Sequence, residues 1–101
     1  MTAQDPADII AVLWERFRPT VAERLDAISA GAEAIADGAT AGDPRVRDAH
    51  RAAHNLAGAL GSYGRPDGSV VARRLMGLLD EPRPRHDAVV GELETLRGHC
   101  A

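Results

Sequence analysis

Two histidines four residues apart, His50 and His54, are the side chains of this chain best suited to chemistry. A neutral imidazole can act as a nucleophile or as a metal ligand. Glycines follow His54 at Gly58 and Gly61, on the same side of the expected helix. Glycine inside a helix costs about 1 kcal/mol relative to alanine. Glycines kept beside an exposed histidine indicate that something approaches the helix backbone closely there.

The helix that carries His54 is predicted from its apolar spacing. Asp43 and Pro44 supply a cap and a first-turn proline, and the helix should run to about Tyr63. Apolar residues recur every three or four positions and should form one buried stripe. These residues are Val46, Ala49, Ala53, Leu56, Leu60 and Tyr63. His54 lies outside the stripe, so its ring should face water.

Helices are also expected on the N-terminal side of this element. Asp5 and Pro6 begin the first helix, and Pro19 should end or kink it near Phe17 or Arg18. A second helix follows with a seven-residue apolar rhythm, and it should stop at Asp37-Gly38.

Two more helices should follow the His54 helix. Asp67 or Ser69 can cap the fourth, which should end before Pro82, and a fifth should carry residues 89–96. With short connections, these elements predict an all-α fold in which residues 1–101 form a single domain. We expect an up-and-down four-helix bundle with a short additional N-terminal helix that covers one end.

Composition excludes several classes of function. Apolar residues make up 45% of the chain and aromatic residues 3%, which favours packed helices over sheets. The net charge of −3, with both signs interspersed, argues against nucleic-acid binding, which needs a basic stripe. No apolar run approaches the length of a membrane span, and the N-terminus lacks a signal pattern. We therefore expect a cytoplasmic protein that does not interact with a membrane. The single cysteine, Cys100, cannot form an internal disulfide.

The run from His54 to Gly64 resembles the signature of histidine-containing phosphotransfer (HPt) domains. The family pattern is His-x-Leu-Lys-Gly, with small residues after it and a second glycine ten positions beyond the histidine; Leu56, Gly58 and Gly64 match it. The chain departs from the pattern where Ala57 replaces the lysine and where Leu75-Met76 replaces the usual Leu-Glu pair. An apolar residue that is usual after the second glycine is missing at Gly68, unless Val70 substitutes for it.

The resemblance implies the same helical bundle and a phosphorelay role. His54 would carry a phosphoryl group between aspartates of response-regulator receiver domains, and a hybrid sensor histidine kinase is another expected partner. The Mg²⁺ and most of the catalysis would belong to the receiver, so this chain should bind no cofactor itself, and the family default is a monomer. The residues expected to contact the partner surround the phosphoacceptor. They are His50, Arg51, Asn55, Ala57, Gly58 and Gly61.

Two alternatives to a phosphorelay carrier stay open at this point, and a metal site is a third interpretation that the spacing does not support. A degenerate HPt-like module would bind a receiver or kinase without transferring phosphate, and Ala57 favours it. A helical adaptor unrelated to phosphorelay would make the motif a coincidence. His50 and His54 could also hold a metal on one helix face, but zinc needs at least one more ligand, so no metal site is predicted.

Overall fold

A computed structural model describes residues 5–101 of the chain. Within this range the chain is all-helical and contains no strand, which confirms the predicted all-α class. The first four residues of the predicted domain lie outside the described range. The four helices are α1 (Pro6–Ala36), α2 (Pro44–Ser62), α3 (Pro66–Leu79) and α4 (His86–His99).

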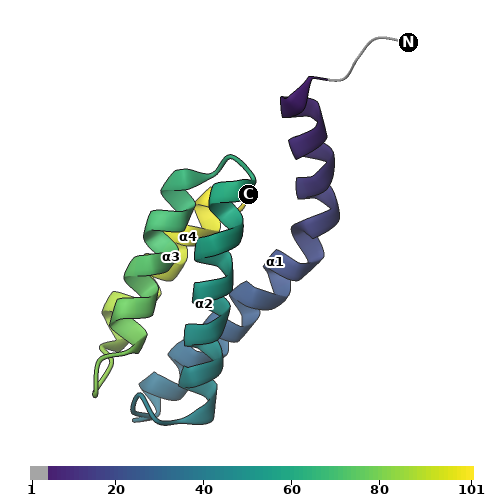
Figure 1. Cartoon of the computed structure of the whole chain (residues 1–101). Helices are drawn as coiled ribbons and strands as arrows, with labels where there is room; N and C mark the ends of the chain where they lie inside the picture. Colours follow the sequence, from purple (N-terminus) through teal and green to yellow (C-terminus); the bar gives the residue numbers. More distant parts are fainter. Residues whose placement is uncertain (1–4) are drawn as a thin grey trace.

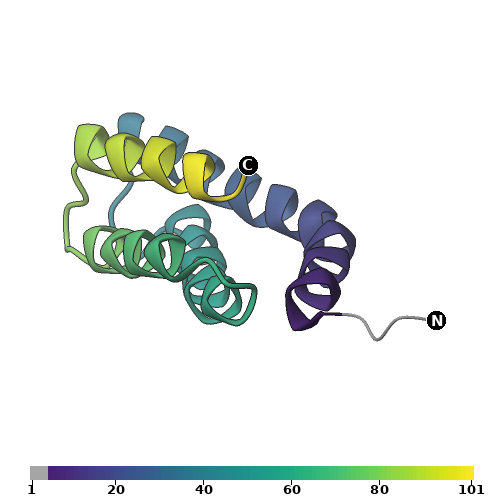
Figure 2. The same ribbon diagram turned by 90° about the horizontal axis from the view of Figure 1, so that it is seen from above.

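The prediction of a separate short N-terminal helix is wrong. α1 continues through Pro19 as one helix of 31 residues, and it bends so that its first part stands away from the other helices (Figures 1 and 2). Proline removes one backbone hydrogen bond and clashes with the preceding turn, which bends a helix without necessarily ending it. Trp14 before Pro19 and Val21 after it are both buried. Packing on both sides of the proline therefore holds the helix together.

The four helices surround one core. α1 packs against α2 and α4, and α3 packs against the same two helices. The largest fully buried side chains come from all four helices. They are Ile28, Leu56, Leu60, Leu75, Leu79, Leu96, Val46 and Val89. No helix within residues 5–101 combines the length and apolarity needed to cross a membrane.

The predicted caps of α1 and α2 are confirmed. The carboxylates of Asp5 and Asp43 each accept a hydrogen bond of 2.9 Å from the backbone N–H two residues later. The Arg45 side chain also donates to Asp43, which lowers the pKa of that carboxyl. α3 differs, because it begins at Pro66 without a side-chain cap. Ser69, expected as a cap, is instead buried and donates its hydroxyl to the carbonyl of Ala57, which joins α3 to α2.

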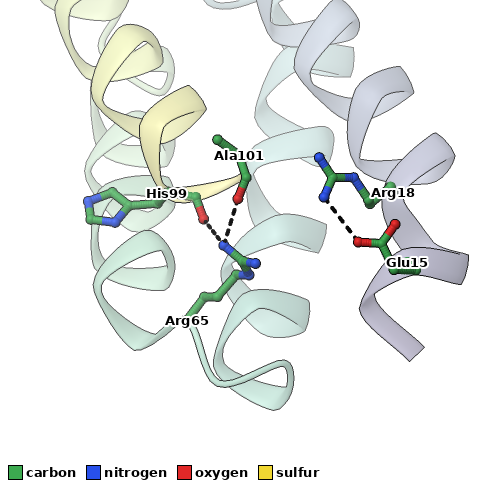
Figure 3. Close-up of polar contacts among 5 residues, drawn as sticks. All are labelled: Glu15, Arg18, Arg65, His99 and Ala101. Atoms are coloured by element: carbon green, nitrogen blue, oxygen red, sulfur yellow. Dashed lines mark hydrogen bonds and ion pairs between the residues drawn. The ribbon is translucent and has the colours of Figure 1, made fainter. Parts of the chain in front are cut away.

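Arg65, in the turn between α2 and α3, contacts the C-terminal end of the chain (Figure 3) and also Trp14 of α1. One of its terminal nitrogens donates to the carbonyl oxygens of His99, at 2.8 Å, and Ala101, at 3.2 Å. Its guanidinium carbon lies 3.9 Å from the centre of the Trp14 ring, a cation–π contact. The rings of Tyr63 and Phe17 stack beside Trp14, and their centroids are 5.0 Å apart. These contacts hold the first half of α1 against the turn that leads into α3.

α1 and α2 approach each other closely at Gly31, and replacing this glycine provides a test of the fold. A Cβ at this buried glycine would overlap the Cβ of Ala49 and lie 3.2 Å from the carbonyl oxygen of Arg45. We expect Gly31→Ala to destabilise the protein by roughly 1–3 kcal/mol, because overpacking outweighs the gain in helix propensity. Thermal unfolding measures this change.

Gly91→Ala in α4 is the matched control. A Cβ there meets nothing within 4 Å, so alanine should stabilise the helix by roughly 0.5–1 kcal/mol. If the Gly31 variant melts as high as the Gly91 variant, the close approach of α1 to α2 is not as described.

Candidate functional site

His54 lies in the middle of α2 with its side chain exposed. The apolar stripe predicted for this helix is buried from Val46 to Leu60, and Tyr63 at its end is half-buried. Leu56, two residues beyond His54, is fully buried. Inward packing of Leu56 and its neighbours therefore fixes the helix rotation that turns His54 outward.

A surface groove of about 400 Å³ lies beside His54. It is bordered by α2, by the end of α3 and by the loop before α2. Its lining residues are Ala41, Val46, Arg47, His50, Arg51, His54, Leu79 and Asp80. The groove thus gathers two guanidinium groups and two imidazoles, with Asp80 as its one acidic residue.

The structure brings only part of the predicted partner-binding set into this groove. His50, half-buried, and Arg51, exposed, line it together with His54. Asn55, Gly58 and Gly61 are exposed on α2 outside the groove. A contiguous partner surface along α2 would have to include both groups.

Ala57 corrects the sequence-based expectation. The residue is only 6% exposed, and its backbone carbonyl accepts a hydrogen bond from the hydroxyl of Ser69 on α3. A methyl group buried between two helices has no surface to offer a partner. Ala57 therefore belongs to the packing of α2 against α3 and not to the docking face.

The two glycines beside His54 leave the helix backbone uncovered. A Cβ at Gly58 would meet nothing within 4 Å, and at Gly61 it would meet only the Ser69 hydroxyl, at 4.0 Å. Packing inside the protein therefore does not require glycine at either position. Their lack of side chains leaves the exposed surface beside His54 flat.

Arg51 forms an ion pair with Asp48, whose carboxylate oxygen lies 3.4 Å from its guanidinium nitrogen. Both side chains are largely exposed, and an exposed ion pair contributes little stabilisation in water. Arg51 can therefore leave Asp48 for a stronger anion in the groove. A phosphoryl group, with nearly two negative charges near neutral pH, is such an anion.

Sequence reasoning missed the contribution of α3 to the groove. Leu79 and Asp80 lie 25 and 26 residues beyond His54, and no motif links them to it. A helical hairpin brings the end of one helix beside the start of the previous one. That rule could have placed the end of α3 beside the start of α2, although it does not indicate which side chains face the groove.

The described residues contain no cluster of three or more side chains that could hold a metal ion. His50 and His54 share the groove, but they lack a third ligand among residues 5–101. Cys100 does not contribute a ligand there, since it is buried at the end of α4, where burial raises the pKa of its thiol.

Neither family models, nor curated protein sequences, nor solved structures yield a match to this chain.

Proposed function

We propose that the chain is a phosphorelay carrier of the HPt type and that His54 is its phosphoacceptor. One observation supports this role most: the motif histidine is exposed from the middle of α2, beside a groove that Arg47 and Arg51 also line. The order of the helices and their short turns suit the up-and-down four-helix bundle of that family. The partners would be response-regulator receiver domains and a hybrid sensor histidine kinase.

The reaction needs little from this chain beyond position and charge. A neutral ring nitrogen of His54 attacks the phosphorus of an aspartyl phosphate on the receiver. The new P–N bond replaces the P–O bond to the aspartate, which leaves as a carboxylate, and the imidazolium then loses its proton. Mg²⁺ bound by the receiver stabilises the transferring group. Reversal of the same steps passes the phosphoryl group to a second receiver.

The cations of the groove would take the place of the family's lysine. Arg47 and Arg51 come from the same side of α2 as His54. Charge-assisted hydrogen bonds from guanidinium groups to phosphate oxygens are among the stronger polar contacts in proteins. A carrier with alanine at position 57 can hold its phosphate in this way.

Gly58 provides a test of docking. Gly58→Ala should stabilise the fold by roughly 0.5–1 kcal/mol, because alanine is the better helix former and its Cβ has open space. The same methyl group would stand on the flat surface beside His54 and slow transfer from a receiver severalfold. A melting curve and a transfer time course on one preparation measure both effects. Gly77→Ala on α3, also with open space, should stabilise without slowing transfer; equal transfer rates for the two variants would contradict the docking role.

A degenerate module that binds a receiver without accepting phosphate is the second candidate. The observation that favours it is Ala57, which is buried and supplies no cation. The two candidates differ in whether a covalent phosphoryl group appears on the chain.

The test is incubation with a phosphorylated receiver domain and Mg²⁺. A carrier should acquire a label that is labile in acid and stable in alkali, as expected for phosphohistidine. Binding to the receiver without label would indicate the degenerate module. Neither binding nor label would refute both and leave an adaptor unrelated to phosphorelay.

A further inference from the structure

The first turns of α1 expose a cluster of large apolar side chains. Ile9, Ile10, Val12 and Leu13 are between 37% and 49% exposed. Within residues 5–101, Val70 is the one other large hydrophobic residue with comparable exposure. Isolated exposed apolar residues are ordinary, but a contiguous patch marks an interaction surface.

This part of α1 has apolar residues on more than one side. Trp14 is buried on the side toward Tyr63 and Arg65, next to a groove of about 450 Å³. The remaining apolar side chains lie on the segment that stands away from the other helices (Figures 1 and 2). A helix that is apolar on several sides is typical of elements with a neighbour on each of them. Among residues 5–101, the turn between α2 and α3 is the neighbour seen beside these first turns.

The residues of the uncovered side follow a self-complementary pattern. Ile9, Val12 and Arg16 are spaced three and four residues apart, so they share one face of α1. Asp5, four residues before Ile9, is the N-cap at the start of that face, and one of its carboxylate oxygens accepts the cap hydrogen bond from Ala7. The face begins with an acid, continues with two apolar residues and ends with a base. If two copies pair antiparallel, Ile9 lies opposite Val12 and Asp5 lies opposite Arg16. A parallel pair would place like charges together.

We propose that this face of α1 binds the same face of a second copy of the chain in an antiparallel, two-fold symmetric pair. The inference replaces the monomer expected from the sequence. Residues 6–18 extend over about 20 Å of helix, and the apolar contact between Ile9 and Val12 of the two copies would occupy about one turn between the flanking charges. The interface would be small, so the pair should form and dissociate reversibly.

The proposed pair leaves the His54 groove accessible. The first turns of α1 lie near the turn between α2 and α3, whereas the groove lies at the other end of α2, beside Ala41 and Asp80. The dimer would therefore present two His54 grooves, one on each copy, and would cover neither. The inference does not depend on phosphotransfer, and its test requires no receiver.

Val12→Glu and Val70→Glu form a matched pair of variants for the test. Both valines are similarly exposed, at 49% and 44%, but Val70 lies on α3. In sedimentation equilibrium of the full chain, Val12→Glu should weaken self-association at least about 10-fold, since each dimer would bury two carboxylates. Val70→Glu should stay within about twofold of the parent chain, and circular dichroism checks that both variants fold.

Arg16→Glu tests the antiparallel register. It should weaken association severalfold at low salt, because two pairs of like charges replace two attractive pairs, and Arg73→Glu on α3 should not. Self-association that requires Val12 and Arg16 supports the proposal. A chain that stays monomeric at millimolar concentration overturns it, as does a dimer that tolerates Val12→Glu or Arg16→Glu.

Discussion

Replacing His54 with glutamine is expected to abolish phosphoryl transfer to the chain while leaving the fold intact. Glutamine keeps the polarity of the side chain but has no nucleophilic ring nitrogen, so label from a phosphorylated receiver should fall at least about 100-fold. The side chain is exposed, so the free energy of unfolding should change by no more than about 0.5 kcal/mol. A transfer time course and a urea titration measure the two quantities.

His50→Gln is the control for that variant. His50 lines the same groove, four residues earlier on α2, and is half-buried. We expect this variant to keep its label and to acquire it more slowly, because a neighbour of the phosphate is altered and the acceptor is not. The assignment of His54 as the phosphoacceptor would be contradicted if the His50→Gln variant acquired no label while the His54→Gln variant was still labelled.

The largest expected effect on stability is that of Leu56→Ala. Leu56 is fully buried and packs on the side of α2 opposite to the exposed face of His54. Truncation of a fully buried leucine typically destabilises a protein by about 2–5 kcal/mol, through lost burial and the cavity that remains. For a chain of this size each kcal/mol lowers the melting temperature by roughly 4–8 °C. Calorimetry should therefore show a large fall in the melting temperature.

Val70→Ala is the comparison for Leu56→Ala. Val70 is 44% exposed, so its truncation should change the free energy of unfolding by no more than about 0.5 kcal/mol. Equal losses in the two variants would mean that Leu56 is not in the core. The assignment of the buried face of α2, which orients His54 outward, would then be wrong as well.

Local patterns along the chain predicted most of the helices. The acid and proline pairs at Asp5 and Asp43 mark real helix starts, because capping chemistry is decided by residues that are adjacent in sequence. The spacing of apolar residues in α2 predicted which side is buried, because a helix of fixed period turns every third or fourth residue the same way. The exposed position of His54 follows from the same rule.

Features that depend on tertiary contacts were not predictable in this way. Pro19 carries a local signal to end a helix, but the buried residues on either side of it outweigh that signal. Ser69 looked like a cap and instead bonds across to the carbonyl of Ala57. Gly31 gave no signal at all, since its role appears only when α1 and α2 are brought together.

The candidate site was predictable in part for the same reason. His50, Arg51 and His54 come from one helix, and their spacing places them together. Ala57 was assigned to the surface because the family motif places a lysine there, whereas the packing of α3 buries it. Leu79 and Asp80 reach the groove from α3, and only the arrangement of the helices places them there.

The measurement that tests the central claim most directly is the location of the phosphoryl group after transfer. The chain would be incubated with a phosphorylated receiver and Mg²⁺, kept at alkaline pH, and fragmented in a tandem mass spectrometer. We predict a single phosphoryl group, on His54. A phosphoryl group on His50, His86 or His99, or an unmodified chain after the receiver has lost its phosphate, would contradict the account.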